Sequence, residues 1–145
     1  MNLLVSQQQS AFIQGRQISE SILVASEVVS MLQKRAMSGL VFKIDFEKAF
    51  DSVSWHFVYE VLSDMNFSTK WISWIRAIFE SSRISILVNG SPTAEFTPRQ
   101  GLRQGDPLSP LLFNLVGEAL AQLLVKGAHQ NIFQGVRVSG FSSPV

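Results

Sequence analysis

The chain has 145 residues and a formal net charge of +1, and it is 46% hydrophobic but only 16% charged. It is long enough to bury a core and too apolar for a disordered tail, and its near-neutral charge does not by itself indicate a nucleic-acid-binding surface. It has no cysteine, which excludes disulfide scaffolds, thiolate nucleophiles and cysteine zinc sites. No uninterrupted apolar run approaches the roughly 20 residues that span a bilayer. The N-terminus lacks the basic start of a signal peptide, so we expect a cytoplasmic or nuclear protein that is not secreted and has no membrane partner.

Four helices are predicted where apolar residues recur every three or four positions. They begin near residues 18, 54, 68 and 106, and the first, second and fourth end near residues 34, 65 and 127. Serine side chains are suitable N-caps for the second (Ser52 or Ser54) and third (Ser68) helices, and Asp106-Pro107 is a suitable start for the fourth. The apolar faces include Ile18, Ile22, Val58, Leu62, Leu112 and Leu123, and in the third helix Ile75 and Ile78 are expected to point inward.

Strands are predicted in three places. Residues 40–46 are a run of strand-forming side chains with a charged end, which indicates a buried strand. Asn89-Gly90 lies between two strand-like runs, 84–88 and 93–97, and both residues tolerate positive φ, so we predict a hairpin with the four-residue loop 89–92. A last strand is predicted at 136–138. Helices mixed with strands and an antiparallel hairpin indicate an α+β fold in which helices back a sheet.

Asp45 is a candidate metal ligand because it ends the first predicted strand. A carboxylate in that position is costly to bury unless it is paired or binds a metal, and carboxylate oxygen suits Mg²⁺. The alternative is a solvated strand end, or an ion pair with Lys43 or Lys48.

Residues 99–110 form the second candidate site. Gly101 and Gly105 allow the backbone to approach a ligand closely. Arg99 and Arg103 bring positive charge, and the Gln104 amide both donates and accepts hydrogen bonds. A phosphate or nucleotide suits such a loop beside a helix N-terminus, although a glycine-containing connector is the alternative. Together the two sites suggest phosphoryl chemistry on a nucleotide.

Three segments carry a family resemblance: 9–18 (QSAFIQGRQI), 43–55 (KIDFEKAFDSVSW) and 103–113 (RQGDPLSPLLF). In order and spacing they resemble the reverse transcriptase of non-LTR (LINE-type) retrotransposons, especially those of plants, over about residues 7–140. The resemblance implies a partial right-hand polymerase fold, with about 1–38 in the fingers and about 39–145 in the palm. It also implies an RNA-directed DNA polymerase that works by two-metal nucleotidyl transfer.

The resemblance also implies residue roles. Asp45 is the first catalytic carboxylate and binds Mg²⁺ together with the backbone carbonyl of Phe46; two ions are expected in the complete enzyme. Phe50 is the aromatic gate that excludes a ribose 2′-hydroxyl, and Arg16 and Arg103 are candidate template or fingers residues. The residues implied in nucleotide binding are Glu47, Lys48, Ala49, Phe50, Gln104 and Gly105.

The expected partners are an RNA template, a DNA primer, a deoxynucleoside triphosphate and the rest of a retrotransposon polyprotein. The family's second metal motif, aromatic-Ala-Asp-Asp, is expected shortly after residue 140 and does not occur in this sequence. We therefore expect a fragment that is inactive alone, and poorly soluble because the strand at 40–46 has an unpaired edge. Two alternatives are a non-catalytic nucleic-acid-binding remnant and a group II intron-type or retron-like transcriptase. Segment 9–18 and Ser54-Trp55 favour the LINE type over the latter. The tryptophans Trp55, Trp71 and Trp74 fall in amphipathic segments and are expected in the core.

Overall fold

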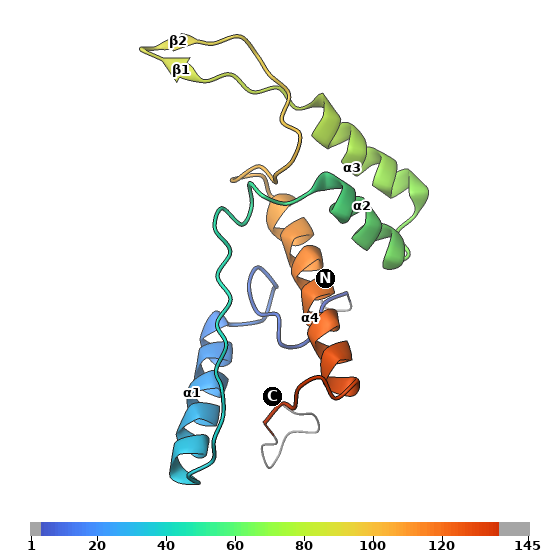
Figure 1. Cartoon of the computed structure of the whole chain (residues 1–145). Helices are drawn as coiled ribbons and strands as arrows, with labels where there is room; N and C mark the ends of the chain where they lie inside the picture. The colour runs from blue at the N-terminus through green and yellow to red at the C-terminus, as the bar shows by residue number, and fades with distance from the viewer. Residues whose placement is uncertain (1–3, 137–145) are drawn as a thin grey trace. The chain divides into compact units, whose positions relative to one another are not determined.

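The computed structural model describes residues 4–136 of the chain (Figure 1). The chain divides into two compact units, one formed by Met1–Asp45 with Gly117–Val145 and the other by Phe46–Val116. Four helices and one two-stranded sheet occur in the described part. The fold is therefore mostly helical, and its β content is smaller than the sequence predicts.

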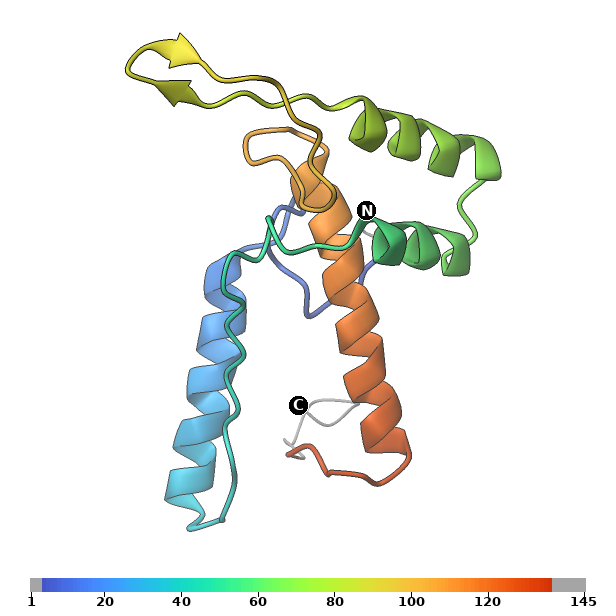
Figure 2. The same ribbon diagram turned by 45° about the horizontal axis from the view of Figure 1, so that its top comes forward.

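Two helices form the core of the second unit. Helix α2 (Trp55–Asp64) begins where the Ser54 hydroxyl accepts a hydrogen bond from the Phe57 N–H, and α3 (Thr69–Ser81) begins where Ser68 accepts from Trp71 N–H. Both N-caps agree with the sequence prediction, which left Ser52 as an alternative for the first. The helices pack against each other, as Figures 1 and 2 both show, through buried apolar side chains of both helices. These are Val58, Val61, Leu62, Ile75 and Phe79.

The predicted hairpin follows α3. Strands β1 (Leu87–Val88) and β2 (Ser91–Pro92) pair antiparallel, and an isolated bridge joins Ile84 to Phe96 further down. Asn89 and Gly90 have φ of 49° and 82°, as a tight turn between twisted strands requires. The loop therefore has two residues, not the four predicted, because Ser91 and Pro92 already belong to β2.

Helix α4 (Ser109–His129) begins in the second unit and ends in the first. The Asp106 carboxylate accepts from the Leu108 N–H at 2.8 Å, so the predicted capping residue acts one turn before the helix itself begins. Among residues 4–136, α4 is the helix whose length and mean hydropathy of 1.3 would suffice to cross a membrane, a test that core helices of soluble proteins also pass. Polar residues such as Asn114 and Glu118 interrupt its apolar sequence, so the chain still has no uninterrupted apolar run of that length.

Helix α1 (Ile18–Lys34) belongs to the first unit, and residues 37–45 run back alongside it in both views. Leu32 is its buried residue, whereas Ile18 and Ile22 are 58% and 62% exposed. Apolar residues in α3 and α4, Ile78 and Leu123, are also exposed. The prediction that Ile78 points inward is therefore wrong, and the apolar faces of α1 and α4 are covered only in part, because periodicity marks the apolar side of a helix but does not supply a partner to cover it.

The strand predicted at 40–46 is not formed. These residues have no helical or strand structure, and Leu40 and Phe42 are 89% and 78% exposed. A strand exists only through hydrogen bonds to a neighbour, and the described residues offer none beside this segment. The strand predicted at 136–138 lies largely outside the described residues. The helix-backed sheet of the sequence prediction is therefore reduced to the hairpin.

Candidate functional site

Two of the motif segments meet within the second unit. The Gly101 N–H donates to the Val53 carbonyl, and the Leu102 N–H to the Phe50 carbonyl, both at 2.8 Å. In the opposite direction, the indole N–H of Trp55 donates a hydrogen bond to the Gly101 carbonyl, also at 2.8 Å. Segment 50–55 and loop 99–106 are some 50 positions apart in sequence, yet three short hydrogen bonds fix one upon the other.

Gly101 is required where these segments cross. Its φ is +93°, and a Cβ at this position would lie 2.9 Å from the backbone oxygen of Asp51. A side chain here would therefore meet rigid backbone as well as an unfavourable conformation. The next residue, Leu102, is only 2% exposed and anchors the loop in the apolar core.

The aromatic residues of segment 50–55 are held by stacking. Phe50 is half-buried and stacks on Phe113 of α4, with ring centroids 4.7 Å apart. Trp55 is half-buried and stacks on Phe79 of α3 at 5.2 Å. Offset stacking of this kind holds a ring in one orientation. Phe50, the predicted gate, therefore has a fixed aromatic support.

A cavity of about 630 Å³ opens beside the anchored loop. Gln104 and Arg103 of the loop line it, as do Asp51 and Trp55 of the other motif segment and Arg83 from the end of α3. Its size lies in the range of small-molecule sites. The structure thus gathers polar, charged and aromatic groups from two motif segments around one cavity.

The remaining predicted residues of segment 45–50 lie around the unit boundary. Asp45 is the last residue of the first unit and Phe46 the first of the second. Both are exposed, as are Glu47 and Lys48, whereas Ala49 is half-buried. Lys48 has a positive φ of 49°, which marks a turn.

The described residues do not by themselves fit a two-ion centre. No group of three His, Cys, Asp or Glu side chains that could hold a metal lies within residues 4–136. Asp45 makes no ion pair with Lys43 or Lys48 there, so that alternative to a metal site is not formed. Asp45 therefore belongs to no such group, and further ligands would be needed to hold Mg²⁺.

Arg16 and Arg103, both candidate template residues, have different surroundings. The Arg16 guanidinium donates to the carbonyls of Ser6 and Gln9, within its own loop. The Arg103 side chain is exposed and makes no hydrogen bond or ion pair within the described part of the chain. Gly105 has a φ of +88°, and no atom lies within 4 Å of the place that a Cβ would take, so its loop turn requires glycine for conformation alone.

Sequence reasoning missed a buried carboxylate in the first unit. Glu118 is 4% exposed and accepts the Ser6 N–H at 2.8 Å, while Gln122 donates to its other oxygen at 2.6 Å. Glu118 thus binds the start of segment 6–16, and Arg16 at its end binds back to Ser6 and Gln9. An acidic residue in an apolar helix was the available signal, because such a group is buried only with partners.

The tryptophans differ from the sequence prediction in part. Trp55 and Trp71 are half-buried, whereas Trp74 is 52% exposed and lies under the Lys70 ammonium, 5.3 Å from its ring centroid. Trp74 is therefore not a core residue. Trp55, by contrast, lines the cavity and bonds the loop, which amphipathic periodicity could not have shown.

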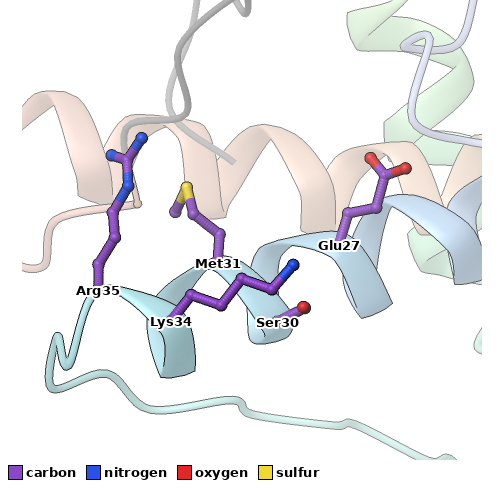
Figure 3. A pocket seen from close by; sticks show the side chains of 5 residues that line it. All are labelled: Glu27, Ser30, Met31, Lys34 and Arg35. Carbon is purple, nitrogen blue, oxygen red and sulfur yellow. The ribbon is translucent and has the colours of Figure 1, made fainter.

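A second hollow, of about 380 Å³, lies on α1 (Figure 3). Its five labelled side chains come from the last turns of the helix and its C-cap: Glu27, Ser30, Met31, Lys34 and Arg35. None of them belongs to the three motif segments. We assign this hollow no part in the candidate site.

Comparisons with known proteins give the family. Residues 2–139 match the family described as reverse transcriptase (RNA-dependent DNA polymerase). Over 116 residues the chain is 30% identical to the Retrovirus-related Pol polyprotein from type-2 retrotransposable element R2DM of Drosophila melanogaster, covering 80% of this chain and 11% of that protein. Over 118 residues it is 28% identical to the transposon TX1 uncharacterized 149 kDa protein of Xenopus laevis, covering 81% and 9%.

A shorter match is 48% identical over 56 residues to an uncharacterized mitochondrial protein of Arabidopsis thaliana, covering 39% of this chain and 46% of that one. The chain spans only 11% and 9% of the two transposon proteins. The family match, in contrast, covers nearly the whole chain. The predicted resemblance to retrotransposon reverse transcriptases is thereby confirmed, and the chain belongs to the reverse transcriptase (RNA-dependent DNA polymerase) family.

Proposed function

We propose that this chain is the part of a LINE-type RNA-directed DNA polymerase that carries the first catalytic carboxylate and the nucleotide-binding loop. The observation that carries the proposal is the anchoring of loop 99–106 on segment 50–55 by the hydrogen bonds of Gly101, Leu102 and Trp55. A family member needs these two motifs side by side to hold one nucleotide. In this chain segment 50–55 and loop 99–106 lie side by side within one unit, which supports the proposal.

The roles within this proposal follow the two motifs. Gln104 and Gly105 contact the incoming nucleotide and its templating base pair, and Phe50, supported by Phe113, excludes a 2′-hydroxyl. Asp45 precedes this unit directly and serves as the first catalytic carboxylate, with the Phe46 carbonyl beside it. The backbone of residues 47–49 lies near the triphosphate. The division into fingers (about 1–38) and palm (about 39–145) belongs to the same proposal.

Divalent metal would supply the activation of the primer hydroxyl and the neutralisation of pyrophosphate in the complete enzyme. The described residues do not complete a metal site, so this chain alone is proposed to bind but not to polymerise. Asp51, Asp64 and Asp106 do not join Asp45 in a metal-binding group. The remaining ligands would come from the rest of the polyprotein.

The proposal is tested by hybrid binding and primer extension. Fluorescence anisotropy of a labelled RNA–DNA hybrid should show saturable binding by the purified chain that weakens as salt rises, because phosphate contacts release counterions. A single-stranded DNA of equal length is the matched ligand control. Affinity with no salt dependence, or equal affinity for both ligands, would contradict hybrid recognition.

Primer extension on an RNA template with Mg²⁺ and deoxynucleotides should give no product above that of Asp45→Ala. Extension by the unchanged chain and not by Asp45→Ala would establish Asp45 as catalytic and show that the chain is complete enough to work. The proposal of an inactive fragment would then be wrong.

A further inference from the structure

The cavity beside the anchored loop has a wall that none of the three motif segments provides. It is formed by the C-terminal end of α3 and the residues that follow, among them Ile78, Ser82 and Arg83. Arg83 is the cation among these wall residues. Arg103 of the loop lines the same cavity from another element.

Arg83 is held in place by the helix that it follows. Its Nη1 donates to the carbonyls of Glu80 at 3.0 Å and of Ser82 at 2.9 Å. Those carbonyls lie at the C-terminus of α3, where a cation is favourable. The two bonds use the hydrogens of Nη1, so the donors on Nε and Nη2 stay available to a ligand.

The two arginines of the cavity are not neutralised by ion pairs. Neither guanidinium lies within ion-pair distance of a carboxylate among residues 4–136, in contrast to Arg76, which pairs with Glu80 at 3.7 Å. Two aspartates also line the cavity. Asp106 is engaged with the Leu108 N–H, whereas Asp51 is exposed and would repel an anion.

We infer that Arg83 and Arg103 together bind a phosphate group in this cavity. Guanidinium is the side chain best suited to phosphate, because its planar donors match phosphate oxygens in pairs. The phosphate would belong to a nucleotide or to a nucleic-acid backbone. The inference rests on the proposed function and adds to it a residue, Arg83, that lies outside the motifs.

The Trp55 indole offers a local spectroscopic signal. Its N–H is bonded to the Gly101 carbonyl at the cavity, so its ¹H–¹⁵N resonance should move when the cavity is filled. The indole signals of Trp71 and Trp74 serve as internal references, since neither lines the cavity. Trp→Phe variants assign the three signals.

The full 145-residue chain is titrated with inorganic triphosphate, dATP, a short single-stranded RNA and deoxyadenosine. The phosphate-containing ligands should shift the Trp55 signal, and deoxyadenosine, which has no phosphate, should not. Tighter binding of triphosphate and dATP would identify the phosphate as a nucleotide's, and tighter binding of RNA would identify it as a backbone phosphate.

Arg83→Gln should weaken triphosphate binding about tenfold, as expected for loss of one charge-assisted contact. Arg76→Gln removes a cation that belongs to α3, the helix before Arg83, and does not line the cavity; it is the matched control, expected to leave affinity within about twofold. Arg83→Lys keeps the positive charge but lacks the paired donors of a guanidinium, so its triphosphate affinity should lie between those of Arg83→Gln and the unchanged chain. Unchanged Trp71 and Trp74 signals show that each variant is folded.

Asp51→Asn should act in the opposite sense and strengthen triphosphate binding several-fold, because it removes a negative charge from the cavity. If Arg83→Gln binds as well as the unchanged chain while Gln104→Ala does not, the inference is wrong and the proposed nucleotide loop stands. If no phosphate ligand shifts the Trp55 signal but the RNA–DNA hybrid still binds, the inference is again wrong. Failure of every ligand would overturn the proposed function as well.

Discussion

Loop 99–106 and segment 40–46, which contains Asp45, are two regions that the sequence marks as functional, and their surroundings differ sharply. The loop is tied to segment 50–55 by backbone hydrogen bonds and by the buried side chain of Leu102. The segment that leads to Asp45 has no regular structure and exposes Leu40 and Phe42 almost completely. A motif segment is therefore ordered only where other residues of the described chain contact it. The composition of the segment alone does not give it a regular structure.

The largest effect is expected where the two motif segments cross. Gly101→Val should lower the free energy of unfolding by about 3 kcal/mol, because its Cβ meets the Asp51 backbone and its φ is unfavourable. Gly105 also has a positive φ, but there is open space where its Cβ would lie. Gly105→Val should therefore lower the free energy of unfolding by about half as much, roughly 1.5 kcal/mol. Urea unfolding followed by tryptophan fluorescence measures both. Equal losses would show that conformation, and not the crossing, requires glycine at position 101.

A smaller effect is expected at the buried carboxylate of the first unit. Glu118→Leu should destabilise residues 6–16 by about 2 kcal/mol, because the Ser6 N–H loses its buried acceptor. Amide hydrogen exchange at Ser6 measures this local stability. Glu118→Gln keeps an acceptor oxygen and should restore most of the protection. Exchange that is unchanged in Glu118→Leu would mean that the segment is held by Val5 and Ile13 instead.

The hydrogen bond between Trp55 and loop 99–106 should contribute less to the free energy of unfolding. Trp55→Phe keeps an aromatic ring against Phe79 but loses the hydrogen bond to the Gly101 carbonyl, at a cost of about 1 kcal/mol. Trp71→Phe is the control, since its indole N–H has no partner among residues 4–136. Chemical denaturation compares the two. A larger loss for Trp71→Phe would assign the stability to packing and not to the bond.

Tyr59 tests the α2–α3 core under alkaline conditions. Burial raises the pKa of Tyr59 above its ordinary value of 10.0, although the nearby Arg76 acts in the opposite direction. The folded chain thus keeps the phenol proton at a pH where the unfolded chain has lost it, and this contribution is present below pH 10 and lost as pH rises further.

Tyr59→Phe should therefore flatten the loss of stability above pH 10. At neutral pH it should change the free energy of unfolding by no more than about 0.5 kcal/mol, since the buried hydroxyl has no hydrogen-bond partner in the described part of the chain. Thermal melts over an alkaline pH series test this. An unaltered pH profile would exclude Tyr59 as the titrating group.

The smallest effect is expected in segment 40–46. Phe42→Ser should leave the free energy of unfolding within about 0.5 kcal/mol, because that side chain is already exposed. It should also raise solubility, measured by light scattering, because it removes an exposed apolar group. Leu102→Ser in the anchored loop is the matched control and should cost about 3 kcal/mol. Similar losses would mean that Phe42 is covered in solution.

The local parts of the fold follow from short-range chemistry. Serines 54 and 68 cap the helices that they were predicted to cap, and Asn89-Gly90 makes the predicted turn. The motif residues also pointed to the family without any structure. The sequence could not predict that Phe50 stacks on Phe113 or that the Trp55 indole donates to the Gly101 carbonyl, because local spacing does not link residues so far apart.

The sequence by itself determined the starts of α2 and α3, the hairpin turn and membership of the reverse transcriptase family. The helix starts and the turn depend on hydrogen bonds and backbone preferences within a few residues, and the family follows from the sequences of the three motif segments. Only the tertiary structure decided that residues 40–46 lack a strand partner, that Glu118 is buried, and that Arg83 lines the same cavity as the loop. The reason is physical: burial and pairing are properties of two surfaces, and a sequence pattern describes only one of them.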